Sequence, residues 1–158
     1  MPTVTIDALV EGAAPCDIFA RIADFARYPE IADSVRSVRV EAGASNRVLS
    51  HWEVTFRNGI LRWTEEDEID ARNATIAFNQ ISGDLAEFVG GWSVTPAGEG
   101  VAIRFTADFD LGIPSLAPML DPVAEKAMRS NVHELIAAFA ADAGGRQRPV
   151  ADTVRAGA

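Results

Sequence analysis

Glu65 and Asp67 are the residues of this sequence whose type and spacing point most directly to chemistry. They stand two positions apart in a segment whose alternate residues are otherwise mostly apolar or aromatic. Residues i and i+2 of a strand share one face, with their side chains about 7 Å apart. On an apolar face, lost hydration and mutual repulsion would raise the pKa of at least one carboxyl and leave an acid beside a base. The pattern therefore indicates proton transfer.

A second interpretation places both acids at a solvated edge, where they would titrate normally. The run Thr64–Asp70 is strongly acidic, and an unpaired buried carboxylate is costly. The apolar face resumes at Ile69, beyond the pair, which favours burial. Both interpretations remain open at this point.

A hairpin is expected to position the two acids. Asn58-Gly59 separates two alternating runs, and this dipeptide tolerates the positive φ angles of a two-residue type I′ turn. Counting outward from the turn gives the pairs Phe56–Leu61, Val54–Trp63, Trp52–Glu65, Ser50–Asp67 and Val48–Ile69, all on the inner face. Ser50 is thus expected either to contact a ligand or to satisfy Asp67 by a hydrogen bond.

Periodicity along the rest of the chain predicts one α+β domain. An alternating run at 3–10 precedes two short helical segments, one beginning at Pro15 and one at 27–33. Further strands are predicted at 35–41, 74–82, 87–96 and 100–110. Apolar residues at helical spacing then run from Pro118 to Ala143. We expect a single domain over 1–143 and a disordered tail over 144–158.

Aromatic residues on the inner faces of these strands predict an apolar ligand cavity. Such residues either fill a core or line the site of a flat ligand. Strand parity places on these faces Trp52, Trp63, Phe88, Trp92 and Phe105. Tyr28, expected near the mouth, would donate a hydrogen bond to a ligand or close the entrance. Asn131, near the inner stripe of the long helix, would orient a carbonyl or hold a water molecule.

Composition excludes several classes of function. The formal net charge of −9 argues against nucleic acid or an anionic membrane as a partner. Phosphate-binding loops and the usual zinc and nucleophile motifs are missing from the sequence, which narrows the range of possible functions. With no long apolar run or signal-peptide pattern, we expect a cytoplasmic protein without stable membrane insertion. The single cysteine, Cys16, is expected to be a packed thiol.

The segments "FARYPEIADSVRSVRV" and "GGWSVTPAGEGVAIRFTADFD", with the tryptophan-bearing hairpin and the closing helix, resemble the START-like helix-grip (SRPBCC/Bet v 1-like) superfamily. The similarity is to its polyketide cyclase/aromatase and coenzyme Q-binding branches. It implies a curved antiparallel sheet of about seven strands around a long C-terminal helix, with two short helices after the first strand. It also implies a deep apolar cavity that binds a hydrophobic small molecule without a metal or cofactor.

Two positions depart from the aromatase/cyclase pattern. The place of a pocket arginine is taken here by Asp67, and that of a tyrosine by Val35. Trp63, Trp92 and Phe105 do match aromatic positions of that cavity wall. The proton relay that the resemblance would imply, through an arginine and a tyrosine, is therefore not expected here. The shape of the cavity wall resembles that of the family more than its proton-transfer groups do.

Two functions fit these expectations best. The first is a cofactor-independent polyketide cyclase/aromatase in which Glu65 and Asp67 transfer protons, with an acyl carrier protein or polyketide synthase as a partner. The second is a non-catalytic carrier of a quinone, lipid or polyketide, for which the cavity suffices. A weaker third is a module that binds another protein.

Overall fold

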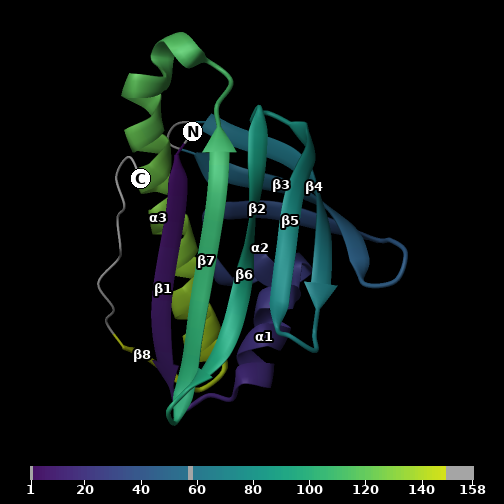
Figure 1. The fold of residues 1–158 in the computed structure, drawn as a ribbon, viewed down its shortest axis with the longest axis vertical. Coiled ribbons are helices and arrows are strands. Elements are labelled where there is room, and N and C mark those ends of the chain that lie inside the picture. Colours follow the sequence, from purple (N-terminus) through teal and green to yellow (C-terminus); the bar gives the residue numbers. More distant parts are fainter. Residues whose placement is uncertain (1, 57–58, 149–158) are drawn as a thin grey trace.

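The computed structural model describes residues 2–56 and 59–148 (Figure 1). As far as residue 142, its order of α-helices and strands is the one that periodicity predicts, apart from two short 3-10 segments. The elements are β1 (Thr3–Glu11), α1 (Pro15–Ala23), η1 (Phe25–Arg27), α2 (Tyr28–Ile31), β2 (Val35–Ala42), β3 (Arg47–Phe56), β4 (Gly59–Asp70), β5 (Thr75–Gly83), β6 (Glu87–Ala97), β7 (Gly100–Asp110), η2 (Pro114–Leu116), α3 (Ala117–Asp142) and β8 (Arg146–Arg148).

The strands form one curved sheet in the order β2-β3-β4-β5-β6-β7-β1-β8, and α3 lies against its inner side (Figure 1). All of its strand pairs are antiparallel. The α+β helix-grip prediction is confirmed. The eighth strand is an addition, because residues 146–148 pair with Leu9–Glu11 of β1. The expectation of a disordered tail from 144 is therefore corrected for these three residues, and 149–158 lie outside the described residues.

The β3–β4 hairpin is paired two residues away from the predicted register. Trp52 lies opposite Trp63 rather than Glu65, and Ser50 lies opposite Glu65 rather than Asp67. The shift is an even number of residues, so every side chain keeps its predicted face. The cross-strand stack of two indoles accounts for the observed register better than the turn preference does. Asn58, on which the predicted turn depended, lies outside the described residues.

Two local features of the sheet lie near the two acids, a register shift at Glu65 and a close approach of strands at Gly90, whose partner Phe78 pairs with Asp67. The pairing of β4 with β5 shifts between Thr64 and Glu65, a β-bulge that adds twist. On β6, a Cβ on Gly90 would lie 2.0 Å from the carbonyl oxygen of Thr106 and 2.9 Å from the ring of Phe78. Gly90 therefore allows strands β5 to β7 to pack closely with the Phe78 ring over it.

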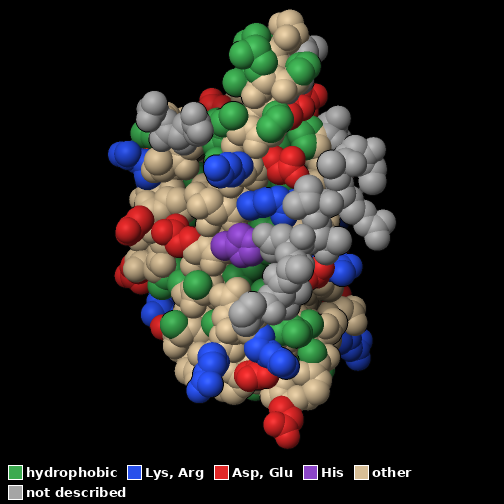
Figure 2. Space-filling model, turned by 90° about the vertical axis from the view of Figure 1, so that its left-hand side faces the viewer, with side chains coloured by type: hydrophobic (Ala, Val, Ile, Leu, Met, Phe, Trp, Pro, Cys, Tyr) green, Lys and Arg blue, Asp and Glu red, His purple; other side chains and the backbone are tan. Residues whose placement is uncertain are grey.

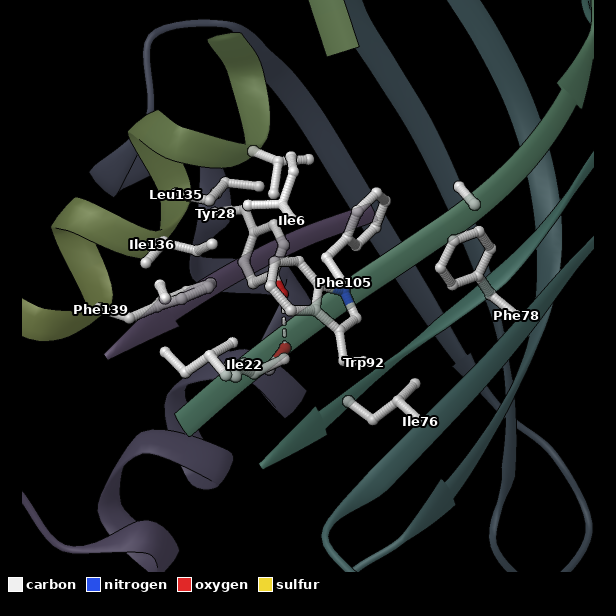
Figure 3. Packing of buried hydrophobic residues seen from close by; sticks show 14 of the residues in the cluster. Ile6, Ile22, Tyr28, Ile76, Phe78, Trp92, Phe105, Leu135, Ile136 and Phe139 are labelled. Atoms are coloured by element: carbon white, nitrogen blue, oxygen red, sulfur yellow. Dashed lines mark hydrogen bonds between the residues drawn. The ribbon is translucent and has the colours of Figure 1, made fainter. Parts of the chain in front are cut away.

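The core lies between the sheet and the second half of α3. Figure 3 shows Leu135, Ile136 and Phe139 of α3 directed toward Trp92 and Phe105 on the sheet. These side chains are buried because apolar burial stabilises the fold by roughly 25 cal/mol per Å². Together they fix the position of α3 relative to β6 and β7.

The exposure of the single cysteine differs from the prediction. Cys16, predicted to be packed, is exposed on the first turn of α1. Hydrophobic side chains gather at the end of the molecule where η2 and α3 begin (Figure 2), including exposed Ile113, Leu116 and Met119. None of the described helices is long and apolar enough to cross a membrane.

Candidate functional site

A cavity of about 120 Å³ lies between the inner face of the sheet and α3. Strands β2 to β7, the segment Phe25–Tyr28 and α3 all contribute to its wall. The lining is almost entirely apolar, and among the described residues that form it Glu65 is the only carboxylic acid, with no basic side chain beside it. The wall includes Phe25, Tyr28, Val35, Trp52, Val54, Phe56, Leu61, Trp63, Ile76, Phe78, Leu85, Phe88, Trp92, Phe105, Phe109, Leu111, Ala124, Met128, Asn131, Val132 and Leu135.

The structure brings most of the candidate residues to this cavity. Those that line it are Tyr28, Trp52, Trp63, Glu65, Phe88, Trp92, Phe105 and Asn131. Ser50 and Asp67 do not line it, although both are fully buried beside Glu65 on the same face. A position in or near the cavity wall does not by itself show that a residue binds a ligand. Contact of these residues with a ligand therefore stays a prediction.

Hydrogen bonds connect the two acids to the two stacked tryptophans. The Ser50 hydroxyl donates to Oδ2 of Asp67 at 2.5 Å, and Nε1 of Trp52 donates to the Ser50 hydroxyl at 2.7 Å. Nε1 of Trp63 donates to Oε1 of Glu65 at 2.7 Å. Each indole thus lines the cavity with its ring and donates a hydrogen bond to the buried polar cluster of Ser50, Glu65 and Asp67. These hydrogen bonds hold both carboxyl groups in fixed positions.

Burial favours the protonated form of Glu65. The pKa of Glu65 lies well above its ordinary value, mainly because the carboxyl is removed from water. A hydrogen bond from protonated Glu65 to Asp67 and the negative charge of Asp67 raise it further, while the Trp63 and Ser50 donors oppose the shift. The pKa of Asp67 is also raised by burial, but the hydrogen bonds from Glu65 and Ser50 lower it. The cluster therefore keeps a proton preferentially on Glu65.

The remaining oxygen of Asp67 supports this distribution of protons. Oδ1 of Asp67 is buried and has no partner among the hydrogen bonds of the described residues. A buried acceptor without a donor costs about 1–3 kcal/mol. A proton on neighbouring Glu65, which shares a side-chain hydrogen bond with Asp67, would be a suitable donor for this oxygen.

Tyr28 is fully enclosed instead of lying at the mouth. Its hydroxyl donates to the carbonyl oxygen of Ile22 at 2.5 Å, shown by the dashed line in Figure 3. Burial and the nearby acids Glu65 and Asp67 raise the pKa of this phenol well above its ordinary value. Tyr28 therefore stays protonated, its hydroxyl is used in the hydrogen bond to the backbone, and its ring lines the cavity.

The lining residues that keep partial exposure mark the mouth of the cavity. They lie near the turn end of the β3–β4 hairpin, after β7 and on α3, and they are Val54, Phe56, Leu61, Trp63, Leu111, Met128 and Asn131. Nδ2 of Asn131 donates to the carbonyl oxygen of Thr55 at 3.4 Å, a long bond that joins α3 to β3. Asn131 therefore stands at the entrance, whereas Glu65 is buried.

Sequence reasoning missed Phe78 and Met128 in the cavity wall. Phe78 shares strand parity with buried Ile76, so the signal was present in β5. On α3 the lining residues Ala124 and Met128 lie four residues apart, and Met128 precedes the lining residue Val132 by four. Counting back from Val132 in steps of four residues would have identified both positions.

The comparisons with known proteins agree with this geometry. The family profile described as "Polyketide cyclase / dehydrase and lipid transport" matches residues 12–136. A search of curated proteins gave no significant match. The structure is similar to that of the protein TTHA0849 from Thermus thermophilus, with 27% sequence identity, a TM-score of 0.81, and coverage of 89% of this chain and 95% of that one.

Two further solved structures share the fold. The Zhui aromatase/cyclase from Streptomyces sp. R1128 has 17% identity and a TM-score of 0.75, over 90% of this chain and 94% of that one. The di-domain aromatase/cyclase StfQ from the steffimycin biosynthetic pathway has 19% identity and a TM-score of 0.73, over 90% of this chain and 51% of that one. Since the family profile covers most of the sequence, the chain belongs to the polyketide cyclase/dehydrase and lipid transport family.

Proposed function

We propose that this protein is a cofactor-independent cyclase/aromatase that binds a hydrophobic, polyketide-type molecule and promotes its cyclisation and dehydration by acid/base catalysis. The observation that carries the proposal is the Glu65 carboxyl, which is buried in an aromatic cavity and favours its protonated form. A neutral carboxylic acid in such a place can donate a proton near neutral pH.

In the proposed aldol closure, Glu65 donates its proton to the carbonyl oxygen under attack while the new carbon–carbon bond forms. The attacking group is the enol form of the chain, and the resulting Glu65 carboxylate takes the proton that the enol hydroxyl releases as its carbonyl re-forms, so the two transfers balance. In dehydration, Glu65 protonates the departing hydroxyl group and recovers a proton from the neighbouring carbon. The acid is regenerated after each step.

Asp67 acts through Glu65 in this scheme, because Asp67 does not line the cavity. Its carboxylate accepts the hydrogen bond that holds the Glu65 proton in place. Asp67 is therefore a positioning residue and a store of negative charge. The aromatic wall contributes separately, since it excludes water and holds a flexible chain in a conformation close to the reacting one.

A carrier function is the second candidate, and the apolar lining favours it. A quinone, lipid or polyketide would bind in the same cavity without any acid. In that case Glu65 and Asp67 would have only a structural role as a buried, hydrogen-bonded pair. The two functions differ in whether Glu65 is needed after the ligand has bound.

The test compares Glu65→Gln with Glu66→Gln. Glu66 is the next residue of β4 but points to the outer face and pairs with Arg47. Turnover of a short poly-β-ketone thioester and tryptophan-fluorescence binding of its stable product are measured for both variants. We expect Glu65→Gln to keep binding within a few-fold and to lose turnover by about 10²–10⁴-fold. Full turnover in Glu65→Gln with unchanged binding would favour the carrier.

A further inference from the structure

The size of the cavity limits what it can hold. Its volume is about 120 Å³. For comparison, a dry engineered cavity of about 150 Å³ in another protein binds one benzene molecule. A space of this volume matches a single six-membered ring and is too small for a fused system of three rings.

The walls resist widening because aromatic rings pack directly against each other. Trp52 and Trp63 are stacked with their planes 3° apart, and the Phe88 ring meets Trp63 edge-on at 5.5 Å. Phe78 also contacts Phe88, at 4.9 Å, and stacks with Phe105 at 5.9 Å. Each such contact adds stability beyond that from the apolar area it buries. Separating the walls to admit a second ring would break several of these contacts at once.

The lining also selects against ligand charge. It contains no Lys or Arg side chain among the described residues, so an anionic ligand would be buried without a counter-ion. A cationic ligand would find only Glu65, which would have to lose its proton inside an apolar wall. An uncharged ring with an oxygen acceptor fits the donor that Glu65 presents.

We propose that the cavity holds one uncharged six-membered ring, or the six-carbon segment that is about to become one, with an oxygen directed at Glu65. The rest of a longer molecule extends through the mouth between Asn131 of α3 and the β3–β4 hairpin. The ring-forming interpretation rests on the proposed function, whereas the limits on size and charge do not.

The size limit is tested by binding a series of aryl ketones to the full-length protein. Acetophenone, 1-acetonaphthone and 9-acetylanthracene present one, two and three fused rings with the same acetyl oxygen. Dissociation constants are measured by tryptophan fluorescence. We expect 9-acetylanthracene to bind at least ten-fold more weakly than acetophenone. Affinity that rises with each added ring would overturn the size limit.

A matched pair of variants locates the limit in the cavity wall. Phe88 and Phe19 are buried to a similar extent, but only Phe88 lines the cavity. We expect Phe88→Leu to bind 1-acetonaphthone about ten-fold more tightly than the parent protein does, and Phe19→Leu to leave its affinity unchanged. Equal effects of the two variants, or no effect of either, would contradict the assignment.

The charge limit has its own ligand series. Benzoate and benzylammonium resemble acetophenone in size but carry a negative and a positive charge. We expect both to bind at least ten-fold more weakly than acetophenone at neutral pH, and tighter binding of either ion would overturn the inference. These readouts need no turnover, so the proposed catalysis can fail while the ring-sized site stands, or the reverse.

Discussion

Trp52 and Trp63 lie directly opposite each other in the β3–β4 hairpin, with ring centroids 5.8 Å apart and planes 3° from parallel. This stack places Ser50 opposite Glu65 one step along the same face. The indole nitrogens of the pair then bond to Ser50 and Glu65. One cross-strand contact thus organises both the aromatic wall and the acid cluster.

Trp63→Phe should raise the pKa of Glu65 further. The substitution keeps a ring in the wall but removes the Nε1 donor, which opposes the upward shift. The Glu65 titration midpoint is measured by ¹³C NMR in both proteins. Trp92→Phe serves as the control, because Trp92 lines the cavity but is not among the groups that shift the pKa of Glu65. A midpoint unchanged or lowered by Trp63→Phe would contradict this role of the indole.

Ser50→Ala should destabilise the fold by about 1–3 kcal/mol, because it removes the donor to buried Asp67 and the acceptor for Trp52. Urea denaturation measures the free energy of unfolding. The matched control is Ser82→Ala at an exposed position of β5, expected to change stability by less than about 0.5 kcal/mol. Equal effects of the two substitutions would show that the buried hydroxyl contributes no net stability.

Glu65→Gln should remove part of the dependence of stability on pH. A carboxyl with a raised folded-state pKa keeps its proton after the unfolded chain has lost its own, so stability falls as pH rises from the ordinary carboxyl pKa to the raised one. Each pKa unit corresponds to about 1.4 kcal/mol. Asp67, whose pKa is also raised, contributes with the same sign.

We therefore expect Glu65→Gln to be more stable than the parent protein above this pH range and to show a flatter profile of unfolding free energy. Denaturant titrations at a series of pH values measure it. A parent protein whose stability increases through the same range, with Glu65→Gln following in parallel, would show that Glu65 is not shifted upward.

Gly90→Ala should disrupt the wall of the cavity. The new Cβ would meet backbone atoms of Thr106 and Ala107 at 2.0 and 2.7 Å, which flexible side chains cannot relieve. Gly98→Ala is the control, since Gly98 has open space around it and only a positive φ of 59°. We expect Gly98→Ala to cost about 1–2 kcal/mol and Gly90→Ala to cost more. Thermal unfolding compares them, and an equal loss would contradict the close packing at Gly90.

The fold was predictable because alternation and helical spacing report which faces are buried. Parity alone placed Ser50, Glu65 and Asp67 on the inner face, where the structure has them buried. The register was not predictable from the turn dipeptide, because the Trp52–Trp63 contact forms between strands and leaves no signal in local sequence. The same holds for Tyr28, whose hydroxyl partner at Ile22 depends on how α1 and α2 pack together.

The different positions of the two acids relative to the cavity could also be determined only from the three-dimensional structure. Their spacing in the sequence showed that Glu65 and Asp67 are neighbours on one face, but it did not show which of them lines the cavity. The curvature of the sheet exposes Glu65 to the cavity and leaves Asp67 behind it. Only the folded sheet therefore distinguishes the acid that lines the cavity, Glu65, from the acid that lies behind it, Asp67.

The most direct test of the central claim is the titration of the Glu65 side-chain carboxyl by ¹³C NMR in the ligand-free protein, assigned by its absence from Glu65→Gln. We expect a midpoint well above the ordinary value of 4.5, with the carboxyl still protonated at pH values at which an unperturbed glutamate is ionised. A midpoint near 4.5 would contradict it, because Glu65 would then be an ordinary carboxylate with no proton to donate in the cavity.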